Sequence, residues 1–162
     1  MKMRTVAALF FCIFICFAAY AAEQAPLVDF ALPEISLPNL DGKTTNLQEI
    51  AQQKPFILTF FTSWSKSCQE QLLDLENISK ENKKVAVIAV SFDKKQKDLK
   101  AFVDKNNLTF PILQDKKLTS LDKFQILTIP TTFCINNDGI IEKTFIDYDE
   151  NVKNAVEEWS KP

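Results

Sequence analysis

Two apolar runs separated by a helical stretch constrain the fold of this chain more than any other feature. The run FILTFFT at 56–62 is rich in β-branched and aromatic residues and is apolar on both faces, which is typical of a central strand covered by helices. The run VAVIAVS at 85–91 has the same character. Residues 69–81 carry an apolar stripe and predict an amphipathic helix. Strand, helix and strand in this order predict parallel neighbours in an α/β sheet.

The second half of the chain continues this alternation and then adds a hairpin and a final helix. Asp93 is positioned to cap a helix whose lysines, between Lys94 and Lys105, face solvent. The NNDG sequence at 136–139 is a strong hairpin signal, which adds antiparallel strands to the sheet. The elements predicted after that helix are an extended piece at 112–113, a helix at 118–124, strands at 131–136 and 140–146, and a helix at 152–159.

A hairpin is also predicted before the first central strand. Asp41-Gly42 is a turn signal between short strands near Ile35 and Thr45. No repeat, low-complexity tract or second domain is recognisable. Residues 26–162 are therefore expected to form one α/β domain, a central mixed sheet flanked by helices with an N-terminal β-hairpin extension.

The first 21 residues are predicted to be a secretory signal peptide. Lys2 and Arg4 form a short positive region, an apolar run follows, and Ala19-Tyr20-Ala21 has the spacing of a signal-peptidase site. An uncleaved anchor is the alternative, because the apolar stretch 6–22 is close to the roughly 20 residues that cross a bilayer. Both alternatives place the domain outside the cytoplasm, periplasmic or secreted, and only the anchor would hold it at a membrane.

What the sequence lacks excludes most classes of enzyme. There is no His, which excludes Ser-His-Asp and Cys-His catalysis and any metal site built on imidazole. Gly42 and Gly139 are the only glycines, too few for a phosphate-binding loop. With 19 basic and 21 acidic residues, the net charge of −2 provides no basic surface for nucleic acid. No metal, cofactor or nucleic acid is expected.

Three groups of segments resemble the thioredoxin-like superfamily. Residues 60–68, FFTSWSKSC, are similar to its strand-to-helix corner, which usually reads W-C-x-x-C, and residues 129–133, IPTTF, are similar to its cis-proline segment. The third group resembles the secreted TlpA/ResA branch of redoxins, which are thiol-disulfide oxidoreductases: FALP at 30–33, DGK at 41–43 and NDG at 137–139. The resemblance runs from about Pro26 to Trp159 and implies a thioredoxin-like fold.

The resemblance also implies a degenerate site, because Ser65 stands where the family has its attacking cysteine and only the second one, Cys68, remains. A thiol at a helix N-terminus can have a pKa of roughly 3.5–7.5 instead of about 8.5. A serine hydroxyl is not ionised by so small an effect, and no His can act as its base. Ser65 is interpreted as a helix cap whose oxygen accepts a backbone N–H. Thr59, at the family's buried polar position, cannot accept a proton as a carboxylate can.

The two cysteines of the predicted domain have different interpretations. Cys68 is either a space-filling relic or a lone thiol that forms mixed disulfides or a sulfenic acid, with Lys66 near in sequence to favour the thiolate. Cys134 is predicted to be a small buried hydrophobe. It lies four strand residues beyond Pro130, roughly 13 Å away, which is too far for a disulfide with a thiol at the motif.

Two functional hypotheses remain, and whether the chain is an enzyme is left open. In the first it is an exported thiol/redox protein limited to one-cysteine mixed-disulfide chemistry at Cys68. In the second it is a non-catalytic module that binds an extended polypeptide in a groove of Trp64, Ile129 and Pro130, where the resemblance implies a cis Ile129–Pro130 bond. A peroxiredoxin mechanism is not expected, because the predicted domain has no Arg to activate peroxide. The partner in both hypotheses is a protein. The exposure and the pKa of Cys68 are the properties that distinguish the two hypotheses.

Overall fold

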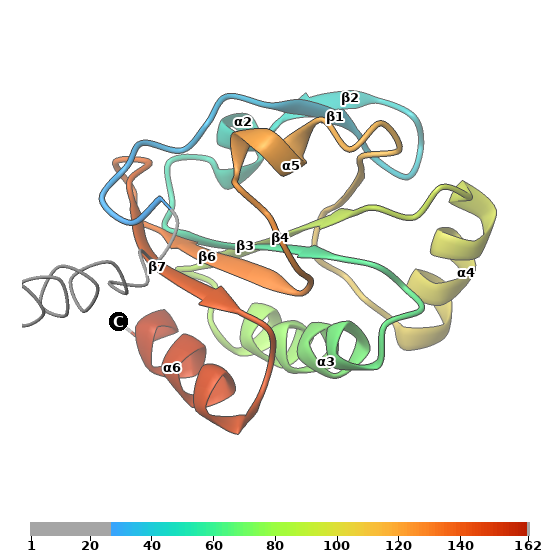
Figure 1. Cartoon of the computed structure of the whole chain (residues 1–162). Coiled ribbons are helices and arrows are strands. Elements are labelled where there is room, and N and C mark those ends of the chain that lie inside the picture. The colour runs from blue at the N-terminus through green and yellow to red at the C-terminus, as the bar shows by residue number, and fades with distance from the viewer. Residues whose placement is uncertain (1–26, 162) are drawn as a thin grey trace, which may run out of the picture.

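The computed structural model describes residues 27–161, which form a three-layer α/β fold around one central sheet (Figure 1). The predicted signal segment, residues 1–21, lies outside the described residues. The strands are β1 (Ser36–Pro38), β2 (Thr44–Asn46), β3 (Phe56–Phe61), β4 (Ala86–Ser91), β5 (Ile112–Gln114), β6 (Thr131–Ile135) and β7 (Ile141–Ile146). The helices are α2 (Leu47–Ala51), α3 (Lys66–Glu81), α4 (Gln96–Asn106), α5 (Ser120–Lys123) and α6 (Glu150–Ser160).

The central sheet has the strand order β5-β4-β3-β6-β7. Strands β3, β4 and β5 are parallel, and β6 and β7 are antiparallel to their neighbours. The mixed sheet predicted from the sequence is confirmed, as is the N-terminal hairpin, in which β1 pairs with β2. Because parallel strands end at the same edge of a sheet, the segments that follow β3, β4 and β5 meet there.

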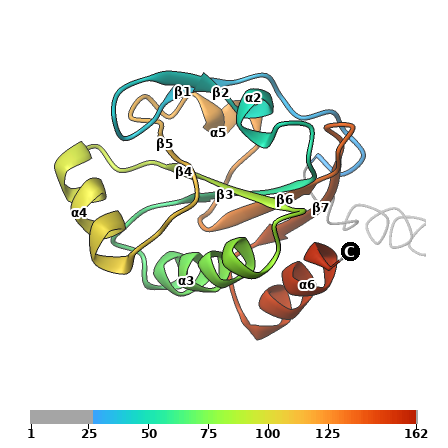
Figure 2. The ribbon, with the colours of Figure 1, turned by 180° about the vertical axis from the view of Figure 1, so that it is seen from behind.

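Each face of the sheet has its own apolar core. One core lies under β1, β2, α2 and α5, and the other lies under α3, α4 and α6 (Figures 1 and 2). Strand β3 serves both, since Leu58 and Phe60 face the first core and Ile57 and Phe61 face the second. This alternation with apolar residues on both faces is the reason β3 occupies the centre of the sheet.

Three details differ from the sequence-based expectations. Helix α3 begins at Lys66 rather than at residue 69, so the whole S-K-S-C motif lies at its start. Helix α2 was not predicted, because its five residues are too few to establish a periodic pattern. Asp93 does not cap α4, whose N-cap is Lys95, because the Asp93 carboxylate is bound by Ser63 and Ser91 instead.

Candidate functional site

Strand β3 delivers the motif to the carboxyl edge of the sheet, and α3 begins directly after it. Ser65 is the N-cap of α3 and has extended backbone angles, as expected for a cap. Its side chain makes no capping hydrogen bond, which corrects the prediction that its oxygen accepts a backbone N–H. The Ser65 hydroxyl oxygen lies 3.3 Å from that of Ser67 instead.

Cys68 lies in the first turn of α3 as a free thiol, and its exposed fraction is 0%. Burial raises the pKa of the Cys68 thiol, and this effect exceeds the lowering by hydrogen bonds from the Ser65 hydroxyl and the Thr62 backbone. The carboxylates of Asp147 and Asp93 raise the pKa further. Cys68 is therefore protonated at neutral pH.

Lys66 does not supply the positive charge that the sequence suggested for this thiol. Its ammonium group pairs with Glu70 at 3.4 Å, one helical turn along the exposed face of α3. Both side chains are well exposed, so the pair contributes little to stability and leaves the neutral form of Cys68 favoured.

A closed ring of three neutral side chains lies between α3 and the sheet. Thr59 Oγ1 donates to Gln71 Oε1 (2.8 Å), Gln71 Nε2 donates to Thr132 Oγ1 (2.9 Å), and Thr132 Oγ1 donates back to Thr59 Oγ1 (3.0 Å). All three residues are buried. The ring satisfies these buried polar atoms and contains no group that can take up a proton near neutral pH.

The segment before β6 approaches the motif through the loop that follows β7. The Ile129–Pro130 bond is cis, as the resemblance implied. The Asp147 backbone N–H donates to the Pro130 carbonyl oxygen at 2.8 Å, and the Asp147 carboxylate raises the pKa of Cys68. Thr131 lies opposite Phe60 in the pairing of β6 with β3, which places Pro130 beside the end of β3, where the motif segment begins.

The three residues predicted to form a groove differ in exposure. Trp64 is 75% exposed, Ile129 is half-buried and packs against both cores, and Pro130 is buried. Leu127, two residues before Ile129, is 96% exposed. Large apolar side chains therefore meet solvent on both segments that flank Cys68.

Cys134 lies on β6 opposite Ile57 of β3 and is fully buried and free. Burial raises its pKa strongly, with a smaller contribution from Glu142. These observations agree with the prediction of a small buried hydrophobe.

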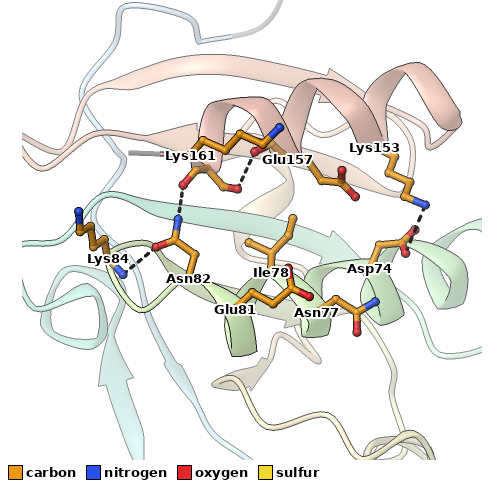
Figure 3. A pocket seen from close by; sticks show the side chains of 10 residues that line it. Asp74, Asn77, Ile78, Glu81, Asn82, Lys84, Lys153, Glu157 and Lys161 are labelled. Carbon is orange, nitrogen blue, oxygen red and sulfur yellow. Dashed lines mark hydrogen bonds and ion pairs between the residues drawn. The ribbon is translucent and has the colours of Figure 1, made fainter.

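A surface hollow lies beside the C-terminal half of α3, away from the motif at the start of the helix. It has a volume of about 470 Å³ and lies between α3 and α6 (Figure 3). Asp74 and Lys153 form an ion pair across it at 3.7 Å, and Asn82 donates to the backbone oxygen of Ser160. Ile78 in its wall is ten residues from Cys68, roughly 15 Å along a helix. The hollow is thus separate from the motif.

Sequence reasoning missed Gln71 near the motif and gave Asp93 a different role. Gln71 could have been noticed as a polar residue beside Leu72 on the buried side of α3. Asp93 was noticed, but its role as an acceptor for the β3–α3 turn depends on the parallel pairing of β3 with β4. Among residues 27–161, no three Cys, Asp or Glu side chains gather into a possible metal site. No helix in that range is long and apolar enough to cross a membrane.

This fold, with a cysteine in the first turn after β3 and a cis-proline before β6, defines a thioredoxin-like protein of the thiol-disulfide oxidoreductase class. Residues 28–144 match the model of the AhpC/TSA family, and the chain belongs to that family.

Several known proteins are similar to this chain. It is 38% identical over 114 residues to the thioredoxin-like protein YneN of Bacillus subtilis, a match that covers 68% of this chain and 66% of YneN. It is 32% identical over 150 residues to sporulation thiol-disulfide oxidoreductase A of the same organism, covering 89% of this chain and 86% of that protein. It is 34% identical over 127 residues to the thiol-disulfide oxidoreductase ResA of Halalkalibacterium halodurans, covering 77% and 68%.

Solved structures agree with the fold. StoA from Bacillus subtilis superposes with a TM-score of 0.66 at 27% identity, covering 84% of this chain and all of that one. A secreted Mycobacterium tuberculosis disulfide oxidoreductase superposes with a TM-score of 0.68 at 18% identity, covering 78% and 93%. The relatives are of ResA and StoA type, and the chain is placed with them.

Proposed function

We propose that the chain works outside the cytoplasm on protein thiols and disulfides, and that its own chemistry is limited to one-cysteine exchange at Cys68. The observation that carries the proposal is the position of this thiol. It lies in the first turn of α3, within hydrogen-bonding reach of the Ser65 hydroxyl. The serine occupies the position from which a dithiol pair would act, so no second thiol adjoins Cys68.

The exchange is a single substitution at sulfur. The Cys68 thiolate attacks one sulfur of a partner disulfide, a new S–S bond forms, and the partner's other sulfur leaves as a thiolate. The proton of Cys68 passes to solvent before the attack. An external thiol must break the mixed disulfide to return Cys68. Because burial and a raised pKa disfavour the thiolate, the forward step is expected to be slow.

A second candidate function is supported by the exposure of Trp64 and Leu127. Aromatic and aliphatic side chains that stand in solvent beside an extended segment are suitable for holding a guest polypeptide. In this case Trp64, Ile129 and Pro130 bind the partner, and Cys68 fills space beneath them. This candidate requires no redox chemistry.

The location outside the cytoplasm rests on the sequence of residues 1–21, with Lys2 and Arg4 ahead of an apolar run. Cleavage after Ala21 would release the domain. The N-terminal sequence of protein recovered from the producing cells tests this proposal. A protein that starts at Ala22 supports cleavage, and one that retains residues 1–21 supports the anchor.

A cystine-containing peptide tests the two functional candidates together. Mass spectrometry of the peptide-treated protein should find one disulfide-linked adduct, mapped to Cys68. The adduct should persist in Cys134→Ala and disappear in Cys68→Ala. Absence of any adduct after prolonged incubation at pH 9 would refute one-cysteine exchange.

Binding is measured separately with a reduced, extended peptide and the Cys68→Ala protein. Trp64→Ala should weaken this binding by about tenfold or more if the tryptophan is a central contact. Trp159→Phe is the matched control, since Trp159 lies on α6 and donates to Glu142. Equal affinities of the Trp64 variant and the control would eliminate the binding candidate.

A further inference from the structure

A second hollow, the β5 hollow, has a volume of about 510 Å³ and lies at the carboxyl end of β5. Its lining includes Leu37 and Pro38 of β1, Gln96 of α4 and residues 114–117. Gln96 Nε2 donates to the Leu40 backbone oxygen at 2.8 Å, which joins the start of α4 to the β1–β2 hairpin. Three segments that are distant in the sequence thus form one depression in the surface.

The β5 hollow lies on the same edge of the sheet as the motif. Phe61 at the end of β3 pairs with Ser91 of β4, and Ser91 pairs with Gln114, which lines the hollow. Neighbouring strands are about 4.8 Å apart, so Gln114 lies roughly 10 Å from the end of β3. Asp93 connects the two places, since its carboxylate accepts from the Ser63 N–H (2.8 Å) and its carbonyl oxygen accepts from Gln114 Nε2 (2.7 Å). An extended polypeptide rises about 3.3 Å per residue, so a chain held at the motif reaches the hollow with about three residues.

Exposed lysines border the β5 hollow. Lys116 and Lys117 line it, and the Lys94 ammonium group donates to the Lys116 backbone oxygen at 2.6 Å. Lys95 and Lys97 are exposed at the start of α4. These five residues form the lysine cluster: Lys94, Lys95, Lys97, Lys116 and Lys117. Within residues 27–161, no member of the cluster forms an ion pair.

The acidic side chains of the same segments do not cover the lysine cluster. Asp93 and Asp115 are buried, and the Asp115 carboxylate accepts from the N–H and the hydroxyl of Ser120, both at 2.7 Å. Asp98 in the first turn of α4 and Asp41 in the hairpin turn are exposed. Exposed positive charge therefore exceeds exposed negative charge around the hollow.

The stability of α4 does not account for the lysines at its start. Lys95 is the N-cap and makes no capping hydrogen bond with its side chain, and Lys97 lies in the first turn. The helix dipole disfavours positive side chains at this end. Attraction of a negatively charged partner does account for them.

We propose that the β5 hollow and the lysine cluster bind an acidic segment of the polypeptide partner that is held at the motif. The Asp or Glu side chains of the partner lie three or more residues from the part that contacts Trp64, and they face the lysine cluster. Such charge complementarity also speeds the encounter of the two molecules. This inference rests on the proposed function for the position of the partner at the motif, and it adds the chemical class of that partner.

The test measures the binding of two synthetic peptides to full-length Cys68→Ala protein, in which no exchange at Cys68 contributes. Each peptide has one cysteine and, after a three-residue spacer on both sides, either three Glu residues or three Gln residues. The Glu peptide should bind about fivefold more tightly or better, because several exposed ion pairs contribute modestly and together. The preference should largely disappear in about 0.5 M sodium chloride, which screens exposed charges.

Charge removal locates the preference on the surface. Lys116→Gln combined with Lys117→Gln should reduce it to less than about twofold and leave the affinity for the Gln peptide unchanged. Lys83→Gln combined with Lys84→Gln is the matched control, because these adjacent exposed lysines precede β4 at the opposite edge of the sheet. Trp64→Ala should weaken the binding of both peptides by the same factor, since it removes a contact with the part that they share.

Equal affinities for the two peptides at low salt, or a preference that persists without Lys116 and Lys117, would overturn the inference. A preference with no effect of Trp64→Ala would also contradict it, since the peptide would then bind away from the motif. Vesicles of phosphatidylcholine and phosphatidylglycerol test the other occupant. If they bind through Lys116 and Lys117 while the peptides are not distinguished, the cluster serves a membrane surface and the inference is wrong.

These outcomes are distinct from failure of one-cysteine exchange. A preference for the Glu peptide with no adduct on the wild type refutes exchange at Cys68 and leaves the acidic partner intact. An adduct on Cys68 together with equal peptide affinities supports the exchange and eliminates the acidic partner.

Discussion

Ser65 and Cys68 are three residues apart at the start of α3, yet their environments differ. Ser65 is half-buried with its hydroxyl near Ser67, while Cys68 is sealed beneath the first turn. The helix N-terminus favours negative charge at both positions. Serine cannot exploit that effect because its hydroxyl is too weak an acid, and Cys68 is opposed by burial. The turn between β3 and α3 therefore places Cys68 where thiol chemistry could occur, but it holds no thiol with a lowered pKa.

Ser65→Cys should therefore create a redox-active pair with Cys68. A thiol at the N-cap position gains from the helix N-terminus and can reach a pKa of roughly 3.5–7.5, so disulfide reduction should rise about tenfold or more over the wild type. The reduction of insulin with dithiothreitol present measures the rate. The mass of the oxidised variant should be lower by two hydrogens, and the same substitution at Ser67 serves as the control. A folded variant that forms no internal disulfide would contradict the placement of this corner.

Prediction from the sequence succeeded for residues whose role depends on local pattern and failed for those whose partners are distant. The burial of Cys134 and the cis bond before Pro130 were expected and are observed, whereas Ser65 is the N-cap of α3 without the predicted hydrogen bond from a backbone N–H. The hydrogen bonds of Asp93 could not be predicted, because Ser63 reaches it only once β3 and β4 pair side by side. The direction of the Lys66 side chain could not be predicted either, because nearness in sequence to Cys68 does not determine where the side chain points.

At the scale of elements, α3 is attached to its surroundings through two buried polar contacts. The ring of Thr59, Gln71 and Thr132 joins the helix to β3 and β6. One turn further along, Glu76 is 4% exposed and accepts from the Thr109 backbone N–H (2.8 Å) and the Thr109 hydroxyl (2.7 Å). The first contact fixes the helix to the sheet and the second fixes it to the loop before β5, which apolar packing alone does not specify.

The contact of Glu76 with Thr109 should make stability depend on pH. Burial alone would raise the pKa of the Glu76 carboxyl, but the two bonds from Thr109 and the charge of Lys80 outweigh it, so the pKa is lowered. A lowered pKa stabilises the fold above the unfolded value, about 4.3, and this stability is lost as the pH falls through the folded value. Glu76→Gln should cost about 1.5–3 kcal/mol at pH 7, the range for hydrogen bonds to a charged group.

Urea unfolding of Glu76→Gln and the wild type between pH 7 and pH 2 measures this effect. The difference between their free energies of unfolding should shrink as the solution is acidified below about pH 4, because the wild-type carboxyl then becomes protonated. Glu70→Gln is the control, since Glu70 forms only an exposed pair with Lys66 and should change stability by less than about 1 kcal/mol. A difference that stays constant over the whole pH range would rule out the ionised contact.

The helices and strands that could be predicted are those whose hydrophobic pattern extends over enough residues. Strands β3 and β4 were located to within one residue, because their apolar runs are short and rich in β-branched residues, which favours a buried strand over a helix. The start of α3 was missed by three residues, because Lys66, Ser67 and Cys68 show no apolar stripe. The final helix was found, and it begins two residues earlier, where Asp149 accepts from the Val152 N–H.

At the scale of the whole molecule, the described chain has two thiols in one core and no disulfide between them. Cys68 on α3 and Cys134 on β6 both contribute to the core beneath α3, α4 and α6, and both are free. The hollow between α3 and α6 lies at the far end of α3 from the motif. Redox chemistry in residues 27–161 is therefore confined to two buried thiols with raised pKa values.

The wild-type protein should not sustain catalytic reduction of a disulfide substrate in the presence of dithiothreitol. A mixed disulfide on Cys68 has no neighbouring thiol to resolve it, since Ser65 occupies the position from which such a thiol would attack and Cys134 is held within β6. Dithiothreitol can release this adduct, but each further attack needs the thiolate of the buried Cys68, which its raised pKa disfavours, so cycling should be too slow to detect. Insulin turbidity should follow the rate of dithiothreitol alone, in the wild type and in Cys134→Ala alike. Turnover above that rate in Cys134→Ala would show that Cys68 exchanges quickly despite its burial and raised pKa, and the prediction of slow exchange would then be wrong.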